Sequence, residues 1–363
     1  EVHNIMTVND KNILWLDMFP TLSYAKKKKL VDIFKDRDIK SSFLYQEGLE
    51  EILTEEDFSK MSHCLDELEF SKILYEFSSD DIEFVTIFDK RYPSQLKKID
   101  NPPLCLYCKG NMQLLNTSCF SIVGSRKPTE YGVVTTKEYA KELSQAGLTI
   151  VSGMAVGVDT LAHETVLENH GATIAVLAGG LYHVYPASNH ALFNKLVVDN
   201  LVITESSPCT QPSAYLFPIR NRIIAGLSMA TVVTEAAEKS GSLTTCNYAY
   251  NFKRKVFAVP GRINAPYSKG CNKLILKGEA KITLSAEDVL ANFNIKPQKK
   301  KSPAIQLDIK HQIVIDYIQF EKKTFQEIAD YTKLSVGELN SILLELELDG
   351  LVYKLANNSY IMA

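Results

Sequence analysis

The stretch FSIVGSRKPTEYG, residues 120–132, indicates how the central part of this chain folds. Its first four residues have the pattern of a buried strand, and Gly124, Ser125 and Arg126 form a turn after it. Thr129 then stands where a residue would cap a helix. Glycine lets the backbone approach a ligand closely, and the free amides at a helix start favour anions. The stretch therefore predicts a strand, a phosphate-binding turn and a helix.

Two later stretches repeat this design. TIVSGMAVGVDTLAHE, residues 149–164, places Gly153 after a short apolar strand, and ATIAVLAGGLYHVYP, residues 172–186, places Gly180 after the next one. Further apolar strands are LVITE at 201–205, MATVVTEA at 229–236 and KVFAVPG at 255–261. A single glycine at a strand end is usually only a tight turn, but their recurrence favours a ligand site. Strands alternating with helices predict an α/β fold, a doubly wound, mostly parallel sheet with ligands beyond the carboxyl ends of its strands.

The central segment resembles a known family. IVGSRKPTEYG, SGMAVGVDTLAH, TIAVLAGGLYHVYP, FPIRNRIIAGLS, EAAEKSGSLTT and VFAVPGRINAP with GCNKLI occur in the order found in the DNA-processing protein A family, also called DprA or Smf. They cover nearly half of the chain. The resemblance implies a Rossmann-like domain that binds single-stranded DNA, dimerises with a second copy, and helps to load a RecA-type recombinase, chiefly in natural transformation.

Charge is distributed unevenly along the chain, whose net charge is −3. The net charge is −6 for residues 1–79, +7 for residues 80–302 and −4 for residues 303–363. Binding to a polyanion depends on local cations that displace counterions, and not on the total for the chain. Ordinary surface variation could also give this pattern, but the positive segment is the one with the predicted phosphate turns.

Two side chains in these stretches suit unpaired DNA. Arg126 can bind a phosphate through both edges of its guanidinium, and Phe217 can stack on a base of any sequence. Phe217 could instead be a core residue, and the two arginines that follow it could instead pair with Glu205 or Glu235. The predicted nucleic-acid-binding residues are Gly124, Ser125, Arg126, Gly153, Gly180, Asn189, Phe217, Arg220, Asn221, Arg222, Ser240, Gly241, Ser242 and Lys273.

Three positions depart from the pattern of the family. Val156 stands where the family usually has Arg, Ile219 interrupts the usual basic run, and His190 stands where Arg or Lys is common. Each change removes or weakens a phosphate partner. We therefore expect weaker or more salt-sensitive DNA binding than in a typical member of the family.

Motifs of catalysis are missing from the sequence. It has no GxxxxGK[ST] phosphate loop, no GxSxG nucleophile turn and no HExxH zinc helix. His163 is interpreted as structural, and the CxxC of Cys105 and Cys108 as packing within a strand, although redox or zinc chemistry is the alternative. We expect no catalytic residue, metal or cofactor. No stretch has the length of a membrane span and we read no signal peptide, so we expect a cytoplasmic protein.

The two ends of the chain differ from its centre. Residues 1–78 have a helical period and predict a small all-helical domain, which in the family resembles a sterile-alpha-motif or helix-hairpin-helix fold. We expect an extended Rossmann-like domain at 79–295 and an exposed linker, KPQKKKSPA, at 296–304. At 305–363, three helical patterns and two strands about an Asn-Asn turn predict a winged helix.

The expected recognition helix of that winged helix, residues 335–348, has three glutamates, Glu338, Glu345 and Glu347, and neither Lys nor Arg. A phosphate backbone should repel it, so we interpret this domain as a protein-contact or packing domain and not as a reader of duplex DNA.

Three functions compete on this reading of the sequence. The leading one is a non-catalytic mediator of recombination that binds single-stranded DNA. The second is a nucleotide phosphoribohydrolase, but the PGGxGTxxE signature of those enzymes is missing and the corresponding place reads EKSGSLTT. The third is a nucleotide-sensing regulator with the winged helix as its output.

Overall fold

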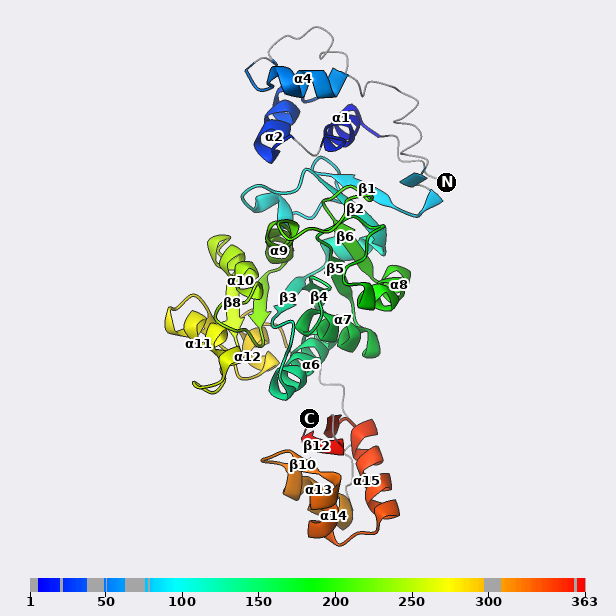
Figure 1. Cartoon of the computed structure of the whole chain (residues 1–363), viewed down its shortest axis with the longest axis vertical. Helices are drawn as coiled ribbons and strands as arrows, with labels where there is room; N and C mark the ends of the chain where they lie inside the picture. Colours follow the sequence, from blue (N-terminus) through cyan, green and yellow to red (C-terminus); the bar gives the residue numbers. More distant parts are fainter. Residues whose placement is uncertain are drawn as a thin grey trace.

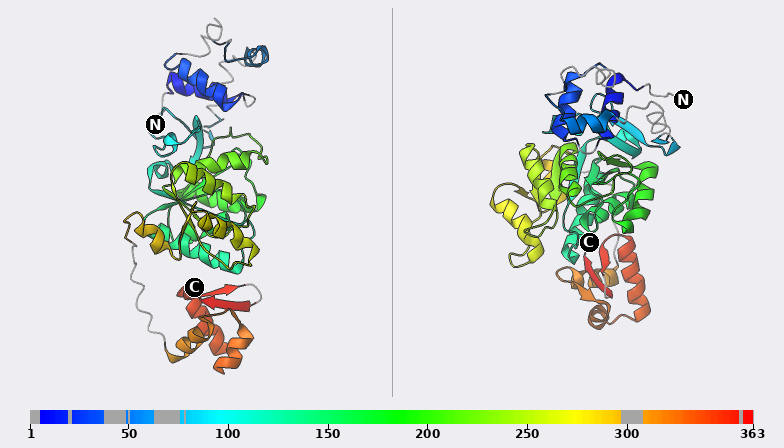
Figure 2. Two further views of the ribbon diagram at one scale, coloured as in Figure 1. Left: turned by 90° about the vertical axis from the view of Figure 1, so that its left-hand side faces the viewer. Right: turned by 45° about the horizontal axis from the view of Figure 1, so that its top comes forward.

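The computed structural model describes residues 6–19, 22–37, 49, 51–62, 76–77, 79–296, 308–355 and 358–362. The chain forms three parts along one long axis, with amino-terminal helices at one end, a large α/β domain in the middle and a small domain at the other end (Figures 1 and 2). Within the described ranges, no helix combines the length and the apolar character that crossing a bilayer requires.

The middle domain contains a nine-stranded sheet in the order β1-β2-β6-β5-β4-β3-β7-β8-β9. The strands from β6 to β9 in this order are parallel, whereas β2 is antiparallel to β6 and β1 to β2. The predicted doubly wound, mostly parallel sheet is confirmed. The strands are β1 (Glu83–Thr86), β2 (Cys105–Gly110), β3 (Cys119–Val123), β4 (Thr149–Ser152), β5 (Thr173–Val176), β6 (Leu201–Thr204), β7 (Ala230–Val233), β8 (Lys255–Ala258) and β9 (Lys281–Ile282).

Helices cover both faces of this sheet, because its central strands are apolar on both sides. In β3, Phe120 and Ile122 belong to one buried cluster, and Cys119 and Val123 to the cluster on the opposite face. Packed on the first face are α6 (Glu130–Gln145), α7 (Val158–Glu168), α8 (His190–Asp199) and α12 (Ala286–Ala291). Packed on the second face are α9 (Leu216–Leu227), α10 (Ser242–Asn251) and α11 (Lys269–Leu276).

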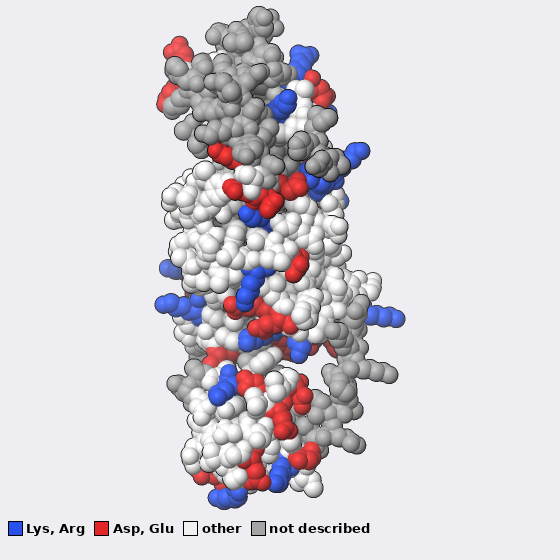
Figure 3. All heavy atoms as spheres, turned by 90° about the vertical axis from the view of Figure 1, so that its right-hand side faces the viewer, with Lys and Arg blue, Asp and Glu red and all other residues white. Residues whose placement is uncertain are grey.

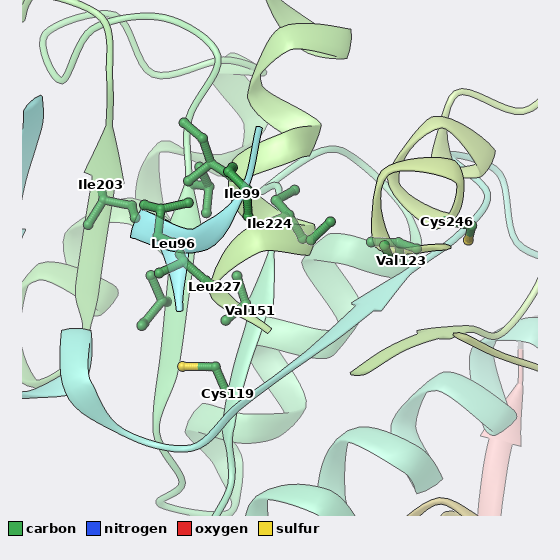
Figure 4. Packing of buried hydrophobic residues seen from close by; sticks show 14 of the residues in the cluster. Leu96, Ile99, Cys119, Val123, Val151, Ile203, Ile224, Leu227 and Cys246 are labelled. Atoms are coloured by element: carbon green, nitrogen blue, oxygen red, sulfur yellow. The ribbon is translucent and has the colours of Figure 1, made fainter. Parts of the chain in front are cut away.

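The second face contains the core that fixes α9. Ile224 and Leu227 of α9 pack with Leu96 of a short 3-10 helix and with Ile203 of β6 (Figure 4). Each of these side chains is at most 3% exposed. Full burial of one such aliphatic side chain stabilises the fold by about 1.5–3 kcal/mol. Helix α9 is therefore held firmly over the middle of the sheet.

The amino-terminal helices share a core with the sheet. They are α1 (Val8–Asp17), α2 (Tyr24–Ile33) and α4 (Glu55–Ser62), and their apolar residues join one cluster with residues of β2, β5 and α8. The Tyr107 hydroxyl in β2 donates to Asp17 Oδ2 at 2.8 Å, and the Tyr24 hydroxyl donates to the carbonyl of Pro102 at 2.8 Å. Of the predicted all-helical domain at 1–78, residues 1–5, 20–21, 38–48, 50, 63–75 and 78 lie outside the described residues.

The carboxyl-terminal domain is a winged helix with its own core. It comprises α13 (Ile309–Ile318), α14 (Phe325–Thr332), α15 (Val336–Leu348) and a three-stranded sheet of β10 (Lys323–Thr324), β12 (Ser359–Met362) and β11 (Val352–Leu355). The sequence predicted only the two-stranded hairpin, and the short β10 adds a third strand by pairing with β12. Most of the predicted linker at 296–304 and one residue of the Asn-Asn turn lie outside the described residues.

Contacts to α6 join the winged helix to the middle domain. Lys322 Nζ lies 2.7 Å from Glu130 Oε2, and Lys137 Nζ lies 5.6 Å from the centroid of the Tyr353 ring. These partners on α6 are seven residues apart and thus lie on one side of the helix. The winged helix uses its strands and its β10 turn for these contacts.

Candidate nucleic-acid interface

A cavity of about 440 Å³ lies where the sheet changes its direction of winding. The helices that follow the adjacent strands β3 and β7 lie on opposite faces of the sheet, α6 on one and α10 on the other. Open α/β sheets bind their ligands at such a switch point, beyond the carboxyl ends of the strands. The cavity is lined by Val123, Gly124, Arg126, Ala155, Asp159, Phe217, Pro218, Arg220, Asn221, Ile224, Ala237, Lys239, Ser240, Gly241, Ser242, Thr244 and Thr245.

Buried Glu235 fixes the turn after β3. The Ser125 amide donates to the Glu235 carbonyl at 2.7 Å, and the Glu235 carboxylate accepts from the Thr129 amide at 2.8 Å and the Thr129 hydroxyl at 2.6 Å. Glu235 is only 2% exposed, so these bonds are shielded from water. Thr129 also caps α6 by accepting from the Gly132 amide. The side chain of Arg126 is left exposed at the cavity.

One side of α9 forms a wall of the cavity. Phe217, Arg220, Asn221 and Ile224 are spaced by three and four residues, so they lie along one side of the helix, and all four line the cavity. Arg222 points away from this side and its guanidinium pairs with Glu205, which follows β6. The structure therefore does not bring Arg222 to Arg126.

Arg220 is buried and joins α9 to the sheet. Its Nη1 donates to the carbonyls of Gly153 and Val176, which follow β4 and end β5, and its Nε donates to Asn221 Oδ1 at 3.1 Å. Burial lowers the pKa of Arg220 to about 10, while the nearby Asp159 carboxylate acts in the opposite direction. Arg220 thus stays charged at neutral pH although it is 5% exposed.

Gly153 is explained by this arginine. A Cβ atom at position 153 would lie 2.6 Å from the Arg220 guanidinium. The glycine therefore makes room for a side chain of the protein. Gly180 is similar, since a Cβ there would lie 2.2 Å from the backbone carbonyl oxygens of Ser207 and Pro208.

A cation and two aromatic rings stand side by side at the cavity mouth. Arg126 Cζ lies 5.3 Å from the centroid of the Phe217 ring, and the Tyr185 ring centroid lies 5.6 Å from that of Phe217. Tyr185 is 51% exposed. A second cavity of about 450 Å³ is lined by Arg126, Tyr185, Pro212, Ser213, Ala214, Phe217 and Pro218. Arg126 and Phe217 thus line both cavities.

The start of α10 forms the wall opposite α9. Ser240, Gly241 and Ser242 line the cavity, and a Cβ at Gly241 would meet no atom within 4 Å. A ligand can therefore approach this backbone closely, which suits an anion at a helix start. The Asn221 side-chain amide donates to the Gly241 carbonyl at 3.3 Å and connects the two walls.

The structure brings together eight of the fourteen predicted residues as lining of the first cavity: Gly124, Arg126, Phe217, Arg220, Asn221, Ser240, Gly241 and Ser242. The other six do not line it, and Arg222 among them pairs with Glu205. Ser125, Gly153 and Gly180 pack beneath the turns, and the Asn189 amide donates to Met154 O and Thr160 Oγ1 at 2.8 Å. Lys273 pairs at the surface with Glu238 at 2.7 Å.

Sequence reasoning missed Tyr185 and Lys239. Both were in stretches with strong signals, Tyr185 in ATIAVLAGGLYHVYP and Lys239 in EAAEKSGSLTT. The tertiary contact of Tyr185 with Phe217, 32 positions later, is what makes it part of the site. Lys239 is exposed and lines the first cavity beside Ser240.

Cys105, Cys108 and His163, which the sequence analysis considered for chemistry, do not line either cavity. Cys105 and Cys108 are buried in β2, and burial raises the pKa of both thiols. His163 Nδ1 lies 2.7 Å from Thr173 Oγ1, and burial lowers the pKa of His163 to about 3, so its ring is neutral. In the part of the chain that the structure describes, no cluster of His, Cys, Asp or Glu could hold a metal ion.

Comparison with known proteins gives two family matches. The family described as DNA recombination-mediator protein A matches residues 83–294, and the DprA winged helix domain matches residues 298–358. The DNA processing protein DprA of Bacillus subtilis (strain 168) is 42% identical over 219 residues, which are 60% of this chain and 73% of the relative.

Two solved structures are similar over most of their own length. The X-ray structure of DNA processing protein A from Streptococcus pneumoniae matches with a TM-score of 0.69 and 34% identity, over 79% of this chain and 98% of that one. The Helicobacter pylori protein, studied for its single-stranded DNA binding mode, matches with a TM-score of 0.53 and 31% identity, over 58% of this chain and 96% of that one.

The structural role of buried Arg220 can be tested by measuring the free energy of unfolding. Arg220→Met should lower the free energy of unfolding by about 3–5 kcal/mol, because it leaves the Asp159 carboxylate and two carbonyls without their buried partner. Urea denaturation at neutral pH measures this. The matched control is Arg126→Met, which changes an exposed arginine and should cost less than about 0.5 kcal/mol. Equal stability of the two variants would contradict the structural role of Arg220.

Proposed function

The chain belongs to the DNA recombination-mediator protein A family, and we propose that it binds single-stranded DNA across the two cavities without breaking a bond in it. The observation that carries this proposal is the row of Arg126, Phe217 and Tyr185, in which a cation and two aromatic rings adjoin between two cavities. The single-stranded DNA binding mode of the similar H. pylori protein also supports it.

The two rings suit a strand whose bases are unpaired. Stacking of a base on an aromatic side chain contributes about 1–3 kcal/mol and is available for every base. In a duplex the faces of the bases are covered by their neighbours. Tyr185 is half-exposed and Phe217 is partly exposed, so both offer a face to a ligand. The row therefore favours single strands over duplexes.

The phosphates of the strand would lie against cations and amides. Arg126 and Lys239 are exposed at the first cavity, and the backbone at Gly241 is open to an anion. We propose that these residues, with Ser240 and Ser242, contact the strand directly. Ser125, Gly153, Gly180, Asn189, Arg220, Asn221 and Arg222 would act by holding the walls in place, and Lys273 would act only after leaving Glu238.

The rim of this site has apolar side chains where the family has cations. Val156 is 40% exposed and follows Ala155, which lines the first cavity. Ile219 is 39% exposed on the side of α9 opposite Phe217 and lines neither cavity, so Val156 is the change at the rim itself. Few cations remain to displace counterions, so we propose weaker binding than in relatives that have arginine at these places.

In the cell, we propose that the protein protects incoming single strands and helps to load a RecA-type recombinase in transformation and recombination. The family description as a recombination mediator supports this role. No observation favours the phosphoribohydrolase, since the cavity has EKSGSLTT where those enzymes have their signature. Asp159 is the buried carboxyl group that lines the first cavity, and it accepts a hydrogen bond from the Gly153 amide, which gives it a structural role.

Three variants test the site. Arg126→Ala should weaken binding to oligo-dT. It should also make the negative slope of log association constant against log salt concentration shallower by about 0.7, the contribution of one phosphate contact. Val156→Arg should strengthen binding and make this slope steeper, because it adds a cation at the rim. Phe217→Ala should weaken binding by about 1–3 kcal/mol with an unchanged slope, since stacking releases no counterion. Fluorescence anisotropy over a salt series measures all three.

Several results would contradict the proposal. These are equal affinity for duplex and single strands, unchanged affinity in both Arg126→Ala and Phe217→Ala, and release of base from nucleoside monophosphates. Filament formation by a RecA-type recombinase on oligo-dT coated with single-strand-binding protein should be faster with the protein present, and slower again with Arg126→Ala. An unchanged rate would contradict the loading role alone.

We also propose a homodimer formed through the β9 edge of the large sheet. At β9 and beside it, Ile282, Leu284 and Leu276 are 55%, 74% and 87% exposed, and edge strands with apolar side chains favour pairing. Sedimentation should give twice the mass of one chain for the protein and a smaller mass for Leu284→Asp. A monomeric mass of the unmodified protein at micromolar concentration would contradict the dimer.

A further inference from the structure

In its carboxyl-terminal half, the outward side of α15 is apolar in its middle and acidic on both flanks. Val336, Leu344 and Leu348 are 64%, 57% and 78% exposed, so three apolar side chains of this helix are available for contact. At about 3.6 residues per turn, Gly337, Ser341, Leu344 and Leu348 fall on the middle of the exposed side, with Glu347 on one flank and Glu345 on the other. The inward side, with Leu339, Ile342, Leu343 and Leu346, is buried in the core of the domain.

The charges of α15 exclude the usual ligand of a winged helix. Glu338, Glu345 and Glu347 lie on this helix without any Lys or Arg. Two of these glutamates have partners on α13, where Lys310 pairs with Glu338 and His311 Nε2 lies 2.9 Å from Glu345 Oε2. Glu345 keeps 60% of its side chain exposed. A duplex would therefore meet Glu345 and Glu347 at the carboxyl-terminal half of the helix and no positive side chain on α15.

The outward side of α15 is also separate from the contacts that hold the domain. The winged helix reaches α6 through Lys322 and Tyr353, which belong to the β10 turn and to β11. Helix α15 runs along the side of the domain that faces the viewer in Figure 3, where acidic atoms gather on the lower domain. This surface is open to a partner while the domain stays joined to α6.

We propose that this side of α15 docks an amphipathic helix of another protein, with an apolar stripe and Lys or Arg on both of its flanks. The apolar middle matches the stripe, and the glutamates match the basic flanks. A Cβ at Gly337 would meet no atom within 4 Å, so the partner helix can pack closely at that point. A second copy of α15 does not fit, because its glutamates would face those of the first copy.

A designed peptide provides the probe. We use a fluorescein-labelled helix with leucines at i, i+4, i+7 and i+11 and lysines on both flanks, and a control peptide with the same leucines and glutamates in place of the lysines. The lysine peptide should bind the full chain, and the glutamate peptide about tenfold more weakly or worse. Leu344→Asp should weaken binding of the lysine peptide about tenfold. The double variant Glu345→Lys with Glu347→Lys should prefer the glutamate peptide.

Controls separate this surface from the rest of the molecule. Val198→Asp changes a 72% exposed side chain on α8 and should leave peptide binding unchanged. Leu344→Asp should leave the affinity for oligo-dT unchanged, so the outcome does not depend on the proposed function. The thermal unfolding midpoint of Leu344→Asp should match that of the unmodified chain, because the side chain lies outside the core.

Four results would overturn the proposal. The first is equal binding of the two peptides, and the second is no binding of the lysine peptide up to millimolar concentration. The third is a loss of duplex DNA binding in Leu344→Asp, which would make α15 a DNA reader. The fourth is a smaller assembly of Leu344→Asp in sedimentation, which would make a second copy the occupant.

Discussion

The guanidinium of Arg220 is the constraint on which the candidate site depends. It is buried between α9 and the ends of β4 and β5, where two carbonyls accept from it and Asp159 lies nearby. Phe217 precedes it by almost one helical turn on the same side of α9. By fixing the rotation of α9 about its own axis, the buried charge determines that the Phe217 ring stands beside Arg126. Buried Glu235 fixes Arg126 from the other wall.

Three arginines that the sequence predicts to bind DNA thus have three different environments in the structure. Arg126 is exposed at the junction of two cavities, Arg220 is buried as a connection between helix and sheet, and Arg222 pairs with Glu205 on the far side of α9. A charge that is taken out of water needs partners, and Arg220 and Arg222 have them within the protein. Arg126 is the exposed one of the three, so its attraction for an anion depends on the ionic strength of the solution.

Much of the fold could be predicted from the sequence, because its strands are short apolar runs separated by helices and several of them end in a glycine turn. The turn at Arg126 followed from that pattern. The tasks of Arg220 and Gly153 could not be predicted, since they depend on which side of α9 faces the sheet. Tyr185 enters the site only through a tertiary contact with Phe217, and local patterns carry no information on such contacts.

The charges of the chain divide the molecule into regions with different partners. An excess of positive charge belongs to the segment that forms the cavities, and an excess of negative charge to the winged helix. The Debye length is about 8 Å at physiological ionic strength, so these regions act on their neighbourhoods separately. An acidic α15 therefore does not weaken the proposed binding of a DNA strand at Arg126, but it disfavours nucleic acid at its own surface. The same chain can then hold DNA at one place and a basic protein helix at another.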